Sequence, residues 1–178
     1  MDSSKRDCWA YGGGTRTVAK RDLVFRPAAY GIVQNAADEV LILTVAKSGK
    51  FVFPGGGIDK GELAHQAVVR EIQEESGIEV KVDKLYHVIE NFFSFHKYKK
   101  PLQAISLCFT CTPTSQENIV PTLQEDNTCV DPRWAALDSL DETAFTELHA
   151  EMLRAYKACL RGQPPDVPGL VAPRPEQF

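Results

Sequence analysis

The chain has 178 residues, 43% of them hydrophobic and 25% charged, and a formal net charge of −4. These values are typical of a globular protein with one domain, and the acidic balance argues against a large nucleic-acid surface. Residues 1–7 are too polar for a secretory signal, and no run approaches the roughly 18 apolar residues of a membrane-spanning helix. We therefore expect a cytoplasmic protein with small-molecule partners, no membrane partner and no stable nucleic-acid complex.

The first third of the chain is predicted to contain an arm and three strands. Three consecutive glycines at 12–14 in a polar setting indicate a flexible arm over residues 1–20. Residues 23–33 are rich in β-branched and aromatic side chains, and the apolar run 40–45 lies between polar turns. Both are typical of strands, and residues 51–53 predict a third short one.

Further extended structure is predicted over residues 78–95 and 104–111. In the second segment bulky and small side chains alternate, as they do on the two faces of a strand. Cys108 and Cys111 form a CxxC pair in that strand, so their side chains should lie on opposite faces. We expect buried, reduced thiols rather than a zinc site.

Two segments carry helical signatures, residues 62–76 and residues 141–160. The first is closed by Gly77, where a left-handed C-cap favours glycine. The second places five residues on one apolar stripe: Leu148, Met152, Ala155, Tyr156 and Cys159. With the strands, the helices predict an α+β or α/β sandwich over residues 21–161, followed by a proline-rich tail at 162–178.

The first helix carries Glu71, Glu74 and Glu75 on one face, at the edge of its buried side. Like charges three and four residues apart destabilise a helix by a few tenths of a kcal/mol each, and anions near its C-terminus cost about 0.3–1 kcal/mol more. A sequence that opposes its own local stability marks a candidate functional site. Three carboxylates suit Mg²⁺ or Mn²⁺, although a solvated glutamate face is the simpler alternative for the helix alone.

The loop before this helix favours the metal hypothesis. Pro54 and the glycines at 55–57 follow a strand directly, so backbone carbonyls and amides can approach a bound metal or phosphate without a Cβ in the way. Arg70 can hold a carboxylate in a bidentate pair. Because the helical wheel turns Arg70 away from Glu71, Glu74 or a loop residue is its expected partner.

Nine fixed positions over residues 56–78 complete a recognisable motif. Gly56 is followed after five residues by Glu62. After seven more residues comes the segment from Arg70 to Ile78, which contains the other fixed positions. This segment resembles the complete Nudix box of the MutT-like hydrolases. The resemblance implies an α+β fold, the Nudix-like αβα sandwich with a mixed β-sheet and a loop–helix–loop catalytic motif. It also implies hydrolysis of the diphosphate linkage in a nucleotide, nucleotide sugar or dinucleoside polyphosphate.

The same resemblance assigns roles to single residues. The implied catalytic residues are Glu71, Glu74, Glu75 and Arg70. The implied metal ligands for Mg²⁺, or alternatively Mn²⁺, are the carbonyl of Gly56 and the carboxylates of Glu71, Glu74, Glu75 and Glu125. Glu62 supports them. The acid ahead of Trp134 could be Glu125 or Asp126, and either is as well explained as a solvated loop residue.

Candidate substrate contacts are Phe51 and Phe53 for stacking on a base, with Arg26 and Gly57 for phosphate. The alternative is that the aromatic residues belong to the core and Arg26 to an exposed strand. A non-catalytic Nudix-fold module that senses a nucleotide or metabolite is the main alternative function. Such modules typically lack one or more box glutamates, and this chain retains them all, so the enzyme is favoured. A homodimer is compatible with the resemblance.

Overall fold

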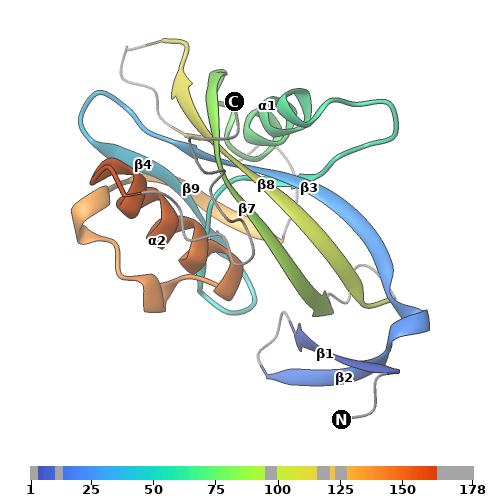
Figure 1. Cartoon of the computed structure of the whole chain (residues 1–178). Helices are drawn as coiled ribbons and strands as arrows, with labels where there is room; N and C mark the ends of the chain where they lie inside the picture. Colours follow the sequence, from blue (N-terminus) through green and yellow to red (C-terminus); the bar gives the residue numbers. More distant parts are fainter. Residues whose placement is uncertain (1–3, 11–13, 95–99, 116–120, 123–127, 164–178) are drawn as a thin grey trace, which may run out of the picture.

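Two β-sheets and two α-helices build the fold (Figure 1). The computed structural model describes residues 4–10, 14–94, 100–115, 121–122 and 128–163. The strands are β1 (Lys5–Ala10), β2 (Thr15–Ala19), β3 (Val24–Val33), β4 (Glu39–Val45), β5 (Phe51–Val52), β6 (Gly55–Gly57), β7 (Val80–Ser94), β8 (Leu102–Pro113) and β9 (Cys129–Ala136). The helices are α1 (Ala64–Ser76) and α2 (Glu147–Leu160), with short 3₁₀ turns at Lys20–Asp22, Leu137–Ser139 and Glu142–Ala144.

The larger sheet has the order β2-β1-β7-β8-β3-β6, and the smaller one has the order β5-β4-β9. Strand β3 pairs in parallel with β8 and antiparallel with β6, and β7 pairs antiparallel with β8. The larger sheet is therefore mixed, as expected. None of the described helices is both long and apolar enough to span a bilayer.

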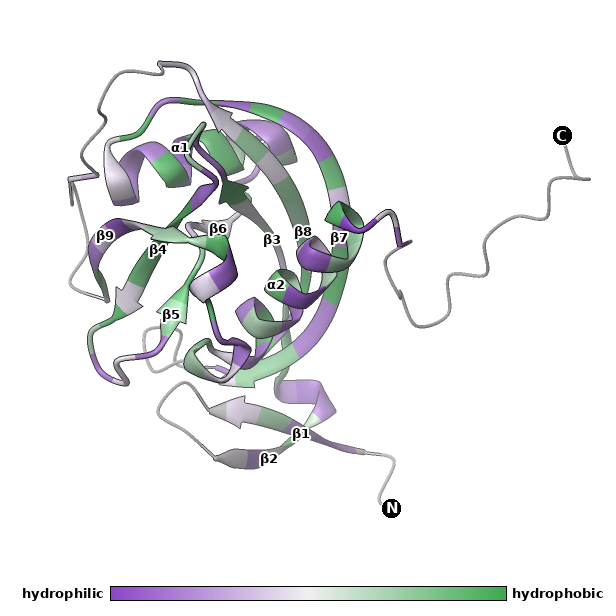
Figure 2. Cartoon of the chain, turned by 90° about the vertical axis from the view of Figure 1, so that its left-hand side faces the viewer, coloured by the Kyte–Doolittle hydropathy of each residue, from purple (hydrophilic) through white to green (hydrophobic). Residues whose placement is uncertain are grey.

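The strands separate two hydrophobic cores, one under each helix. On β4, Val40 and Ile42 belong to the core under α2, whereas Leu41 belongs to the core under α1. Strands buried on both faces carry continuous apolar runs, which explains the pattern at 40–45. Both helices show alternating hydrophobic and hydrophilic bands in Figure 2. The predicted αβα sandwich is confirmed.

Cys108 lies in the core under α2 and Cys111 in the core under α1, so the pair faces opposite sides of β8. Both thiols are free and buried. Burial raises the pKa of Cys111 to about 12 and raises that of Cys108 further above the usual range. The thiols are inert core residues, as their spacing indicates.

Both helices are shorter than predicted. Helix α1 begins at Ala64 and ends at Ser76, and Gly77 forms the expected C-cap with a φ of 71° and an N–H bond to the Gln73 carbonyl. Helix α2 begins only at Glu147, because Phe145 pairs with Phe51 in an isolated bridge and is 2% exposed. Burying Phe145 breaks the helix that the pattern at 141–146 suggested.

Within the predicted flexible arm, the described residues 4–10 and 14–20 contain ordered strands. Strands β1 and β2 form a hairpin, and Cys8 and Val18 are buried. Strand β1 also pairs in parallel with β7, opposing Trp9 to Phe93. The hairpin therefore extends the edge of the larger sheet, below both helices in Figure 1. The predicted tail at 162–178 lies outside the described residues from 164 on.

Candidate active site

A cavity of about 290 Å³ lies on the face of the larger sheet that α2 covers, next to the glycine strand β6. Residues of β1, β3, β6, β7, α1 and α2 contribute to its wall. Its lining includes Trp9, Arg26, Tyr30, Phe53, Gly55, Gly56, Glu71, Glu75, Asn91, Phe93, Glu147, His149 and Glu151. The cavity thus joins the predicted box to residues far away in the sequence.

Strand β6 pairs with β3 so closely that it requires glycine. Gly55 has a φ of 140°, and a Cβ there would lie 2.4 Å from the carbonyl oxygen of Ala29. A Cβ on Gly56 would lie 2.5 Å from Oε1 of Glu71. The glycines allow the backbone to approach β3 on one side and the α1 carboxylates on the other.

Arg70 ties α1 to this strand. Its Nε lies 2.9 Å from Oε1 of Glu62, and its Nη2 donates to Oε2 of Glu62 at 3.0 Å and to the carbonyl of Gly57 at 3.1 Å. Its Nη1 lies 3.1 Å from carboxylate oxygens of both Glu71 and Glu74. The partners expected from the helical wheel, Glu74 and a loop residue (here Gly57), are both present. The long side chain of Arg70 also reaches the carboxylate of Glu71.

Glu62 has a structural role, because its carboxylate is held by hydrogen bonds. Besides Arg70, it accepts a hydrogen bond of 3.0 Å from the backbone N–H of Asp59. The Arg70 hydrogen bonds, followed by that backbone bond, lower the pKa of Glu62 to about 2. The carboxylate is ionised at neutral pH and holds the turn before α1 against Arg70.

The three helix glutamates are oriented differently. Glu71 and Glu75 line the cavity, and Oε2 of Glu75 accepts a hydrogen bond of 2.9 Å from the N–H of Gly55. Glu74 pairs with Arg70 and keeps 43% of its side chain exposed. Burial raises the pKa of Glu71, an effect that Arg70 partly offsets. Two of the three predicted carboxylates therefore meet in the cavity.

The oxygen groups at this end fit a hard divalent cation. Glu71 and Glu75 offer carboxylates, and the Gly56 backbone lies against the carboxylate of Glu71. Within the described parts of the chain, however, no three His, Cys, Asp or Glu side chains converge as a metal-binding group. The predicted ligand Glu125 and its alternative Asp126 lie outside the described residues.

The predicted substrate contacts divide into two groups. Arg26 and Phe53 line the cavity, and Gly57 lies beside Arg26, since a Cβ there would come 2.5 Å from Nη2 of that arginine. Phe51 does not line it. The Phe51 ring instead packs edge-on against Phe145 at 5.6 Å, with the guanidinium of Arg133 4.8 Å from its centroid.

His149 supports the cavity wall, a role that its spacing in the sequence did not suggest. Its Nδ1 accepts a hydrogen bond of 3.1 Å from the backbone N–H of Phe53, and its ring packs edge-on against Tyr30 at 5.1 Å. Burial lowers the pKa of His149 to about 3. The neutral ring fixes Phe53, which lies in the link between β5 and the glycine strand β6.

Trp9 and Asn91 are cavity residues that sequence reasoning also missed. The only signal for Trp9 was the alternation on both sides of the glycines at 12–14, which is also typical of a hairpin. Asn91 had no signal, because its position on the cavity face depends on the pairing of β7 with β8.

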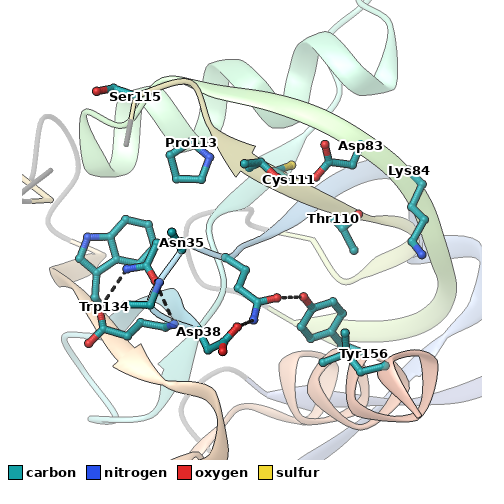
Figure 3. A pocket seen from close by; sticks show the side chains of 16 residues that line it. Asn35, Asp38, Asp83, Lys84, Thr110, Cys111, Pro113, Ser115, Trp134 and Tyr156 are labelled. Carbon is teal, nitrogen blue, oxygen red and sulfur yellow. Dashed lines mark hydrogen bonds between the residues drawn. The ribbon is translucent and has the colours of Figure 1, made fainter. Parts of the chain in front are cut away.

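A larger hollow of about 890 Å³ lies elsewhere, near the turn from β3 to β4 (Figure 3). Polar side chains there are paired with one another: Asn35 with Glu39, Gln34 with Asp38, and Thr112 with Asp83. None of the predicted site residues that the structure describes lines it. The smaller cavity is therefore the candidate active site.

Known proteins resemble this chain in sequence and in fold. A family model described as NUDIX domain matches residues 24–156. The chain is 39% identical over 85 residues to an 8-oxo-dGTP diphosphatase from Escherichia coli K12, covering 46% of this chain and 60% of that protein. It is 32% identical over 78 residues to diphosphoinositol polyphosphate phosphohydrolase 2 from Mus musculus, covering 43% of this chain and 44% of that protein. The matches therefore span about half the length of these curated relatives.

A solved structure, the MutT NUDIX hydrolase from Burkholderia pseudomallei, shares the fold. It aligns with a TM-score of 0.60 at 20% identity, covering 74% of this chain and 98% of that chain. At this identity the likeness concerns the arrangement of sheets and helices alone. The N-terminal hairpin lies before the segment that the family model matches.

Proposed function

This chain belongs to the NUDIX domain family, and we propose that it is a divalent-metal-dependent hydrolase that cleaves the diphosphate linkage of a nucleoside diphosphate derivative. One observation carries the proposal. Glu71 and Glu75 line the same cavity as Arg26, beside a glycine strand against which the side chains of Glu71 and Arg26 both pack. Carboxylate ligands for a metal and a guanidinium group for a phosphate thus lie within one cavity, as binding of a metal-complexed diphosphate requires.

We assign phosphate binding, metal binding and positioning to different residues of the site. Arg26 attracts a phosphate oxygen, and Glu71 and Glu75 hold the cation with help from the Gly56 carbonyl. Arg70 fixes the direction of the Glu71 carboxylate and anchors α1 to Gly57. A bound Mg²⁺ or Mn²⁺ would neutralise phosphate charge and lower the pKa of the attacking water.

Glu74 has a separate role in this proposal. Its carboxylate pairs with Arg70 and lies toward solvent. We assign it to positioning Arg70, with metal binding reserved for Glu71 and Glu75. The proposed setting is the cytoplasm.

The test is turnover of purified protein on a panel of nucleoside triphosphates, nucleotide sugars and dinucleoside polyphosphates with Mg²⁺ or Mn²⁺. Release of phosphate, pyrophosphate or a mononucleotide should require the metal and should stop with a chelator. Glu71→Gln and Glu75→Gln should each lower kcat by about a hundredfold or more. Glu79→Gln, at an exposed position after α1, is the matched control.

Two outcomes would contradict the proposal. The metal assignment fails if both cavity glutamates can be replaced without loss at saturating Mg²⁺. Tight nucleotide binding with no turnover across the panel would instead favour the sensing module.

A further inference from the structure

Trp9 reaches the candidate active site from outside the segment that the family model matches. Strand β1 pairs in parallel with β7, and Trp9 opposes Phe93 in that pairing. Residues directly opposed across two strands lie on the same face of a sheet. Trp9 and Phe93 both line the cavity that holds Glu71 and Glu75. The hairpin therefore adds an aromatic surface to the cavity.

Asn91 lies on β7, as Phe93 does, and lines the same cavity. Its Oδ1 is fully buried and has no hydrogen-bond partner among the described residues. A buried acceptor without a donor is costly, so native proteins generally supply one from protein, water or ligand. An N–H group of a bound molecule would meet this requirement.

The charges of the cavity indicate what kind of group can occupy this end. Among the described residues that line it, Arg26 is the only lysine or arginine, and the carboxylates are Glu71, Glu75, Glu147 and Glu151. A moiety carrying many phosphates would need several cations. An aromatic wall with hydrogen-bond acceptors instead fits a neutral, planar heterocycle with N–H donors.

Resting on the function proposed above, we propose that Trp9 and Asn91 form the base-recognition end of the site. Trp9 supplies a surface on which a nucleobase stacks, and Asn91 accepts a hydrogen bond from an N–H on the edge of that base. The substrate class is then a nucleoside diphosphate derivative, in preference to a diphosphorylated polyol. The N-terminal hairpin is part of the binding site.

The experiment measures equilibrium binding to the full chain without metal, so that it needs no turnover. The probes are adenosine and guanosine monophosphate, their analogues that lack the exocyclic amino group, and ribose 5-phosphate, which lacks the base. We expect at least one nucleotide to bind about tenfold or more tightly than ribose 5-phosphate. The member of the amino pair that binds better identifies the donor that Asn91 accepts.

Three variants separate the contributions. Asn91→Leu should lower affinity for the preferred nucleotide by about tenfold and abolish the preference within its pair, leaving ribose 5-phosphate binding unchanged. Trp9→Leu should weaken all nucleotides by about tenfold, and Trp9→Phe should retain most of the affinity. Circular dichroism and thermal unfolding check that the hairpin stays folded.

Equal affinity for nucleotides and ribose 5-phosphate would overturn the proposal, as would an Asn91→Leu variant that weakens both probes alike. A protein that discriminates bases in this assay but hydrolyses nothing would retain the base site and refute the hydrolase. A protein that hydrolyses nucleotides but binds them no more tightly than ribose 5-phosphate would retain the hydrolase and refute the base site.

Discussion

Oε2 of Glu75 accepts a hydrogen bond of 2.9 Å from the backbone N–H of Gly55, which ties the last turn of α1 directly to the glycine strand. The bond explains why an acidic residue is placed where the helix dipole disfavours it. It also means that the glutamates and the glycines form one structural unit. A substitution in β6 should therefore shift the positions of the carboxylates.

Gly56→Ala should separate activity from stability. The new Cβ would lie 2.5 Å from Oε1 of Glu71, and a carboxylate at the end of a flexible side chain can move away. We expect kcat/KM to fall by about a hundredfold, because a misplacement of about 1 Å has such an effect. The free energy of unfolding should change by less than about 1 kcal/mol.

His65→Ala, at an exposed position of α1 outside the cavity, is the control for that variant. Urea unfolding and steady-state kinetics would be measured on both proteins. Full activity of Gly56→Ala would show that Glu71 does not need its present position.

Arg70→Lys should reduce stability and activity together. Lysine keeps the charge but loses the planar fork that bonds Glu62 twice and reaches the carbonyl of Gly57. We expect a loss of about 1–2 kcal/mol in the free energy of unfolding and about a tenfold fall in kcat/KM. Arg154→Lys, in an exposed pair with Glu142, should cost less than about 0.5 kcal/mol. Similar losses in both variants would mean that the Arg70 contacts have no special role.

Glu62 should make stability depend on pH in the acid range. Its folded pKa of about 2 lies below the ordinary value of 4.5, so its contribution is fully present above about pH 4.5 and is lost as the pH falls toward 2. Urea midpoints of wild type and Glu62→Gln should therefore differ by a constant amount above pH 5 and converge below it. A difference that is independent of pH would contradict the ion pair.

His149 should remain neutral where an ordinary histidine gains its proton. Burial holds its folded pKa near 3, below the usual 6.5. The neutral ring favours the folded state above pH 6.5, and that contribution declines as the pH falls from 6.5 toward 3, because only the unfolded chain binds the proton. NMR signals of the His149 ring should stay fixed between pH 8 and 5 in the folded protein and should titrate in urea. A folded-state titration near pH 6.5 would show that the ring is solvated.

Much of the fold follows from local patterns in the sequence. Helix α1 was predictable because Gly77 marks its end, and β4 because a strand buried on both faces reads as an apolar run. Strand β9 was missed because it contains Pro132 and a left-handed Asp131 with a φ of 55°. Such residues normally indicate a turn.

The candidate site was predictable only in part. The box identified Glu71 and Glu75, but the outward direction of Glu74 depends on the side-chain geometry of Arg70. Phe51 carries the same β-strand signal as Phe53 and both rings pack against Phe145, yet only Phe53 lines the cavity. Contacts between distant segments determine these differences, so no local pattern could reveal them.

Arg26→Ala should weaken substrate binding more than it slows the chemical step. Arg26 is the only lysine or arginine among the described residues lining the cavity, and it lies beside Gly57, across strand β6 from Glu71. A charge-assisted bond to phosphate that is made in both ground and transition states raises KM when it is lost, with little effect on kcat. We expect KM to rise by about ten- to thirtyfold and its dependence on salt to diminish. Arg21→Ala, at an arginine whose side chain is 89% exposed, should leave both parameters unchanged. A fall in kcat at constant KM would place Arg26 at the reacting phosphate instead.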